Sequence, residues 1–163
     1  NRGQYLDDTL VDVVPTDFCV GVAGYPEKHC EAPNMEIDIE NLKRKVEAGA
    51  DYIVTQMFFD NSKFFSFVEK CRAVGITVPI IPGIKPISTM RHIELLPQAF
   101  SLDIPQELMR ELVKCRNNEA IYKLGIEWAT LQCKELLEWG ARSVHFYTMG
   151  KADNIREIIK RAF

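Results

Sequence analysis

Apolar runs that alternate with amphipathic helical stretches are the feature that most constrains the fold of this chain. Four runs have the length and composition of β-strands, and each is followed by a polar loop and at least one stretch of helical periodicity. The predicted strands are residues 18–24, 52–59, 78–84 and 143–148. Strands that alternate with helices form parallel sheets with right-handed crossovers, so the sequence predicts an α/β fold.

The stretches between and after these runs predict six helices, at residues 35–48, 62–74, 88–96, 105–114, 118–139 and 153–162. A glycine follows three of them, as is common where a helix ends in the left-handed conformation, at Gly49, Gly75 and Gly140. Pro105 suits the first position of its helix, because the missing N–H has no partner there.

Two of the predicted strands carry additional information. Residues 18–24 are apolar without interruption, which is typical of a strand covered on both faces. Pro79 and Pro82 argue against a regular central strand at 78–84, because each removes a hydrogen-bond donor from the ladder.

Four strand–helix units are compatible with two architectures. An open doubly wound sheet closes at this length, but Gly21 and Gly24 do not form the Gly-x-Gly-x-x-Gly phosphate motif. The other architecture is half of an eight-stranded barrel, since a whole barrel needs about 250 residues and this chain has 163. Residues 1–17 then form a lead-in helix or loop, and the opening without Met indicates an internal starting point.

Composition limits the partners and the compartment. Lys and Arg number 20 and Asp and Glu 23, for a net charge of −3, and no basic arm predicts nucleic-acid binding. No apolar run has the length of a membrane span and no signal peptide is recognisable. The 5 cysteines include no Cys-x-x-Cys pair, which favours reduced thiols in a cytoplasmic protein. His29 beside Cys30 lacks a second ligand pair, so we expect no metal.

Polar side chains gather where the predicted strands end, which is where parallel barrels place their active sites. These residues are Tyr25, Glu27, His29, Gln56, Lys85, Tyr147, Thr148 and Lys151. The Gln56 amide either reads the edge of a flat heterocycle or bonds to backbone in the core. Lys85 either acts as a Schiff-base lysine or is exposed or bonded to backbone.

The helix predicted at residues 35–48 carries a polar stripe at spacings of three and four, made of Asp38, Asn41, Arg44 and Lys45. Its apolar stripe, which faces the sheet, is made of Ile39, Leu42 and Val46. The polar stripe is either a solvated face or a clamp for a phosphate or pyrophosphate, to which arginine offers a fork of donors and lysine a point charge.

Five segments of the chain resemble methylenetetrahydrofolate reductases, in the same order: residues 23–29, 41–50, 55–60, 80–84 and 145–149. The resemblance implies a TIM (β/α)8 barrel, with residues 1–163 forming about four C-terminal βα units of one catalytic domain. It also implies FAD as cofactor and NADH or NADPH as hydride donor. The implied reaction is the reduction of 5,10-methylenetetrahydrofolate to 5-methyltetrahydrofolate in one-carbon metabolism and methionine biosynthesis, by an enzyme that is a homo-oligomer when full-length.

The resemblance also assigns roles to residues. The FAD-contacting positions correspond to Tyr25, His29, Ala32, Asp38, Asn41, Arg44 and Lys45. The substrate-contacting positions correspond to Gln56, His92, Tyr147 and Lys151. His92 stands where some relatives have glutamine, and Lys151 where an arginine is found, which changes the contacts to the folate tail. The acid of the reaction comes from an early strand of the family barrel, so we expect no catalytic residue within residues 1–163.

Two other functions are compatible with the sequence. In the leading interpretation the chain by itself is a fragment without activity. The first alternative is a non-catalytic assembly module, in which two such half barrels pair edge to edge. The other alternative is an aldolase-type barrel in which Lys85 forms a Schiff base.

Overall fold

The computed structural model describes residue 9 and residues 14–163, so most of the predicted lead-in at residues 1–17 lies outside the described residues. Residues 14–17 have no regular secondary structure. Within the described part of the chain, no helix combines the length and the apolar character that crossing a membrane requires.

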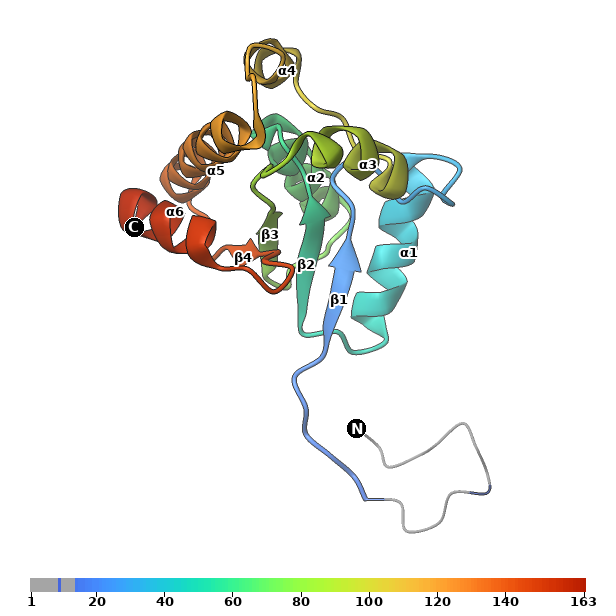
Figure 1. Ribbon diagram of the computed structural model, residues 1–163. Coiled ribbons are helices and arrows are strands. Elements are labelled where there is room, and N and C mark those ends of the chain that lie inside the picture. The colour runs from blue at the N-terminus through green and yellow to red at the C-terminus, as the bar shows by residue number, and fades with distance from the viewer. Residues whose placement is uncertain (1–8, 10–13) are drawn as a thin grey trace.

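In the described residues, four strands form one sheet in sequence order, β1-β2-β3-β4, and each neighbouring pair is parallel (Figure 1). The strands are β1 (Gly21–Gly24), β2 (Tyr52–Met57), β3 (Ile80–Ile84) and β4 (His145–Phe146). The prediction of an α/β fold with a parallel sheet is therefore confirmed. An unbroken strand order with a helical crossover after each strand is the arrangement expected of part of a (β/α)8 barrel.

Over residues 14–163, six helices connect and follow the strands: α1 (Met35–Glu47), α2 (Asn61–Ala73), α3 (Met90–Phe100), α4 (Gln106–Leu112), α5 (Asn118–Trp139) and α6 (Asp153–Ala162). α5 and α6 have the predicted bounds. α3 begins later and ends later than predicted, continuing past Pro97 until Ser101 adopts a left-handed φ of 52°. Pro105 is the residue before α4 rather than its first residue.

Side-chain caps explain where three helices begin. Asn34, Asp60 and Asn117 each accept a hydrogen bond from a backbone N–H of the first turn, at 2.9 Å. The predicted glycines end helices as expected, with φ of 113° at Gly49 and 110° at Gly140.

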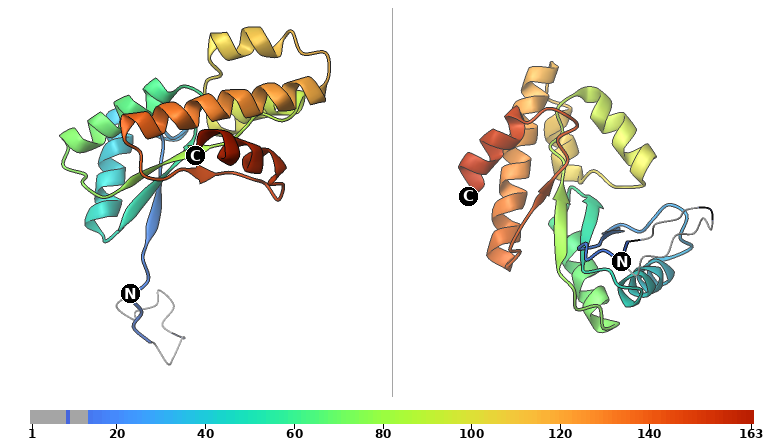
Figure 2. Two further views of the ribbon diagram at one scale, coloured as in Figure 1. Left: turned by 90° about the vertical axis from the view of Figure 1, so that its left-hand side faces the viewer. Right: turned by 90° about the horizontal axis from the view of Figure 1, so that it is seen from below.

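The core has two parts that together position the ends of the strands. The larger part joins one face of the sheet to α1, α2, α5 and α6, and Ile53 at its centre has no exposed surface. The smaller part joins the C-terminal ends of β2 and β3 to α3, α4 and α5, above the sheet in Figure 1. Two further views, one from the side and one from below, show the helices on one side and at one end of the sheet (Figure 2). The predicted apolar stripe of α1 is confirmed, since Ile39 and Leu42 are buried there.

The expectation that residues 18–24 are covered on both faces is wrong. Phe18 is 72% exposed and Val20 is 40% exposed. The physical reason is that β1 is an edge strand, and the helices cover one face of the sheet. The strand predicted at 143–148 is also shorter than expected, because β4 pairs with β3 at only two positions, beside Gly83 and Ile84.

The strand predicted at 78–84 is present as β3, which lies between β2 and β4 with Pro82 inside it, and its ladder is not regular, as the prolines predict. The ladder between β2 and β3 is irregular at this point, with a register shift between Val54 and Met57. The Gly83 N–H donates to the Thr55 hydroxyl at 2.9 Å instead of to a ladder carbonyl. This irregularity accommodates a residue that has no N–H to donate.

Candidate functional site

The loop between β1 and α1 is shaped by its own hydrogen bonds. The Lys28 N–H donates to the Tyr25 carbonyl at 3.1 Å, and Lys28 adopts a left-handed φ of 79°. The Lys28 ammonium donates to the carbonyls of His29 and Ala32 at 3.0 and 2.6 Å. These hydrogen bonds of Lys28 hold the loop that carries Tyr25 and His29 in a fixed shape.

A hollow of about 540 Å³ lies between this loop and α1, and we call it the loop hollow. Its lining residues are Tyr25, His29, Glu31, Ala32, Pro33, Asp38, Asn41 and Lys45. The His29 N–H donates to Asp38 Oδ2 at 2.8 Å, which ties the loop to α1. The rings of Tyr25 and His29 meet edge to face, with 4.6 Å between their centroids. Six of the seven predicted cofactor residues thus surround one space.

Arg44 is the predicted cofactor residue that does not line the loop hollow. Its guanidinium forms an ion pair with Glu40 at 2.6 Å, one turn back on the exposed surface of α1. Lys43 pairs with Glu47 at 3.8 Å in the same way. Lys45 is the basic residue of this run that lines the hollow. Burial, and to a smaller extent the charge of Asp38, raises the pKa of Tyr25, so the phenol stays protonated.

A second hollow, of about 370 Å³, lies beyond the ends of β3 and β4, and we call it the rim hollow. Its lining residues are Lys85, Ser88, Thr89, His92, Tyr122, Thr148, Met149, Lys151, Asp153 and Asn154. The structure therefore brings together His92 and Lys151, which lie 59 positions apart in the sequence. His92 Nδ1 accepts the Ser88 N–H at 3.2 Å, and burial, followed by the charge of Lys85, lowers the pKa of His92.

Tyr147 joins the ends of three strands. Its hydroxyl donates to the Thr55 carbonyl at 2.9 Å, and its own carbonyl accepts from Lys85 at 3.3 Å. Gly83 allows this approach, because a Cβ there would lie 2.8 Å from the Tyr147 ring. Burial raises the pKa of Tyr147, and the nearby Tyr25 adds to the shift.

Gln56 is half-buried at the end of β2, and it does not line either hollow. Its Oε1 atom accepts the neighbouring Met57 N–H at 2.9 Å. Of the two interpretations of this amide, the bond to backbone is present. Because Gln56 is still half-exposed, a contact between its amide and a bound ligand stays a prediction.

Glu27 is a half-buried member of the polar set at the strand ends, and the resemblance assigned it no role. Its Oε2 atom accepts the Asp103 N–H at 3.0 Å, across 76 positions of sequence. Its Oε1 atom is buried and has no hydrogen-bond partner in the described part of the chain. Burial raises the pKa of Glu27. No local pattern announces this contact, because its partner belongs to the segment between α3 and α4.

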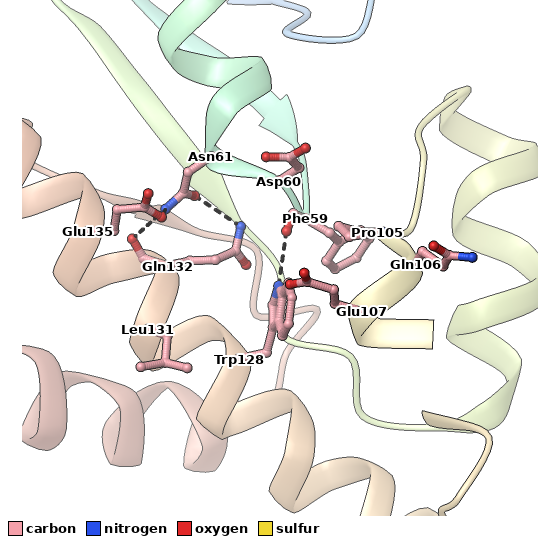
Figure 3. Close-up of a pocket in the computed structure, with 10 residues that line it drawn as sticks. All are labelled: Phe59, Asp60, Asn61, Pro105, Gln106, Glu107, Trp128, Leu131, Gln132 and Glu135. Atoms are coloured by element: carbon pink, nitrogen blue, oxygen red, sulfur yellow. Dashed lines mark hydrogen bonds between the residues drawn. The ribbon is translucent and has the colours of Figure 1, made fainter. Parts of the chain in front are cut away.

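A third hollow, of about 630 Å³, lies between the end of β2, α4 and α5 (Figure 3). It is larger than the loop hollow, but its polar groups bond to one another. Trp128 Nε1 donates to the Phe59 carbonyl at 3.0 Å, and Asn61 Nδ2 donates to Glu135 at 2.6 Å. Its charged lining residues are the carboxylates of Asp60, Glu107 and Glu135, which would repel a pyrophosphate. We therefore interpret this hollow as part of the packing between α5 and the sheet, and not as a binding site for a nucleotide.

Comparison with known proteins identifies the family to which the sequence is similar. The sequence model of the methylenetetrahydrofolate reductase family matches residues 5–162. A probable methylenetetrahydrofolate reductase (NADPH) of Caenorhabditis elegans is 42% identical over 145 residues, which are 88% of this chain and 22% of that protein. The 5,10-methylenetetrahydrofolate reductase of Salmonella typhimurium is 38% identical over 138 residues, which are 84% of this chain and 47% of that enzyme.

A solved structure of an uncharacterized protein from Clostridium thermocellum, described as binding two copies of 5-methyl-5,6,7,8-tetrahydrofolic acid, has a similar fold. The TM-score is 0.62 at 19% identity, over 90% of this chain and 52% of that one. The chain spans about a quarter to a half of the length of the curated relatives described above. With a family match over nearly its whole length, the chain belongs to the methylenetetrahydrofolate reductase family.

Proposed function

We propose that the protein carrying this chain reduces 5,10-methylenetetrahydrofolate to 5-methyltetrahydrofolate, using FAD and a nicotinamide nucleotide. The observation that carries the proposal is the loop hollow, which gathers six residues at positions that the resemblance assigns to FAD. NADH and NADPH are both within the proposal, because relatives are named for each of them. In this proposal the chain supplies the last four βα units of the barrel, and the acid of the reaction belongs to the units before them.

The residues of the loop hollow suit the parts of FAD by charge and shape. Lys45 offers an ammonium to the pyrophosphate, and Asn41 offers amide donors and an acceptor. One Asp38 oxygen already accepts the His29 N–H, so the other is available to a sugar hydroxyl. The edge-to-face rings of Tyr25 and His29 form an aromatic wall for a flat ring system. FAD, when bound, would supply the hydride-transfer chemistry.

The rim hollow is the proposed place of the folate. It opens at the same end of the sheet as the loop hollow, and Tyr147 lies between Thr55 of β2 and Lys85. His92 and Lys151 are proposed to contact the folate tail, while Gln56 and Tyr147 are proposed to contact the part nearer the flavin. The similar fold of a protein described as binding 5-methyltetrahydrofolic acid supports this choice of substrate class.

The alternatives have less support. The relatives are named reductases, which argues against an aldolase with a Schiff base on Lys85. We also propose that the full-length enzyme is a homo-oligomer, and that it works in the cytoplasm. The latter is supported by the free state of all five cysteines, of which Cys19 and Cys30 are exposed.

Absorbance spectroscopy and flavin titration test the proposal. We expect the purified protein to be yellow, and to be bleached by NADH or NADPH without oxygen and restored by methylenetetrahydrofolate. Lys45→Met and Asn41→Leu should each raise the dissociation constant for FAD about tenfold or more, the loss expected for one hydrogen bond to a charged group. Lys43→Met is the matched control, because this lysine on the same helix pairs with Glu47 and does not line the hollow.

Two results would count against the proposal. A colourless protein that cannot be reconstituted with FAD would remove the cofactor assignment. Equal effects of Lys43→Met and Lys45→Met would show that only the general charge of α1 matters, and not the loop hollow.

A further inference from the structure

Lys85 is a buried ammonium whose bonding within the chain is incomplete. It directly follows β3 and is only 7% exposed. Its Nζ atom donates to the Tyr147 carbonyl at 3.3 Å, which uses one of three possible donors. None of the ion pairs found in the described residues includes it. Burying a cation without a charged partner is costly, so its presence needs an explanation.

The surroundings of Lys85 point to an anion. Lys85 lines the rim hollow together with a second cation, Lys151, and one carboxylate, Asp153. Ser88, Asn154 and His92 of the same lining are linked to one another by hydrogen bonds at 3.2 Å, so this wall of the hollow is fixed in shape. Burial lowers the pKa of Lys85, and the charge of Lys85 in turn helps to lower the pKa of His92. A carboxylate in the hollow would relieve both effects.

We propose that Lys85 is a further ligand-binding residue, whose ammonium binds a carboxylate of the glutamate end of a folate in the rim hollow. This inference rests on the proposed function, since it takes the ligand to be a folate. The remaining Lys85 donors and Lys151 provide two positive groups at one hollow, and the glutamate end of a folate carries two carboxylates. Lys85 thereby selects folates that retain this end.

The test compares two ligands that differ only in the glutamate. Binding of 5-methyltetrahydrofolate and of its glutamate-free analogue, 5-methyltetrahydropteroyl methylamide, which keeps the amide but carries no carboxylate, is measured by calorimetry with the full-length protein loaded with FAD. Lys85→Met keeps the length of the side chain and removes the charge. Lys85→Gln is the second variant, which keeps a donor. Lys134→Met, on an exposed position of α5, is the matched control.

We expect Lys85→Met to weaken the binding of 5-methyltetrahydrofolate about tenfold or more, as for a lost hydrogen bond between charged groups. Binding of the uncharged methylamide analogue should change by less than about twofold, and Lys85→Gln should lie between wild type and Lys85→Met. Lys134→Met should bind both ligands as the wild type does. Because a methionine replaces a buried cation, folding should be retained, and a thermal melt checks this.

If Lys85→Met weakened the binding of both ligands equally, or changed the binding of neither, the role of Lys85 would be overturned while the proposed function stayed intact. A wild-type protein that binds neither ligand would instead refute the proposed function, and the inference about Lys85 would fall with it. The wild-type titration thus separates the two failures.

Discussion

Gly125 provides the sharpest test of how α5 supports the candidate site. This buried glycine of α5 lies against the backbone of Ile87, in the loop that connects β3 to α3. A Cβ atom at Gly125 would lie 2.8 Å from the carbonyl carbon of Ile87 and closer still to its oxygen. Carbon atoms pack at about 3.5–4.0 Å, so Gly125→Ala must displace the loop by roughly 1 Å.

Two opposing effects decide the outcome. Alanine is favoured over glycine inside a helix by about 1 kcal/mol. Forcing an additional methyl group into a packed site costs about 1–3 kcal/mol, and here the obstacle is backbone, which cannot rotate away. A backbone obstacle places the cost in the upper part of this range, at about 2–3 kcal/mol. We therefore expect a net loss of about 1–2 kcal/mol in the free energy of unfolding, which lowers Tm by roughly 2–8 °C for a domain of this size.

Thermal and urea unfolding measure the change, with Glu138→Ala on the exposed face of α5 as control. Because Lys85 and Ser88 flank the displaced Ile87, Gly125→Ala should also weaken folate binding more than FAD binding. A variant that is more stable than wild type by about the full helix-propensity gain of 1 kcal/mol would refute the close approach of α5 to this loop.

Two further predictions concern buried polar groups. Since burial raises the pKa of Glu27, the ionised form destabilises the folded state as pH rises above the usual range of a carboxyl. Glu27→Gln should therefore stabilise the protein at pH 7 and have little effect at pH 4, and melts across this range check the direction; a gain that grows toward low pH would contradict it. Gln132→Leu leaves the Phe58 carbonyl and Asn61 Oδ1 without their donor, so we expect a loss of about 1–3 kcal/mol. Urea unfolding measures that loss, with Leu131→Gln on the exposed neighbouring position as control.

Local sequence patterns predicted the succession of helices and strands along the chain. α5 and α6 match their predicted bounds, because a glycine ends α5 and an aspartate begins α6. β4 was predicted too long, because residues 143–148 have the composition of a strand but only His145 and Phe146 find partners on β3. Strand propensity does not contain the register of a neighbouring strand.

The candidate site was predictable where it is built from one loop and one helix. The stripe on α1 correctly groups Asp38, Asn41 and Lys45, since helical spacing fixes their common face. The same spacing includes Arg44, but an ion pair with Glu40 holds that side chain elsewhere. The contacts of Glu27 with Asp103 cross 76 positions and have no local signature.

A crystal structure of the full-length protein with FAD tests the central claim most directly. We expect electron density for the nucleotide in the loop hollow, with the pyrophosphate within hydrogen-bonding distance of Lys45 and Asn41 and the flavin ring beside Tyr25. Density for FAD in the hollow beside Trp128, or at any place away from the β1–α1 loop, would contradict it.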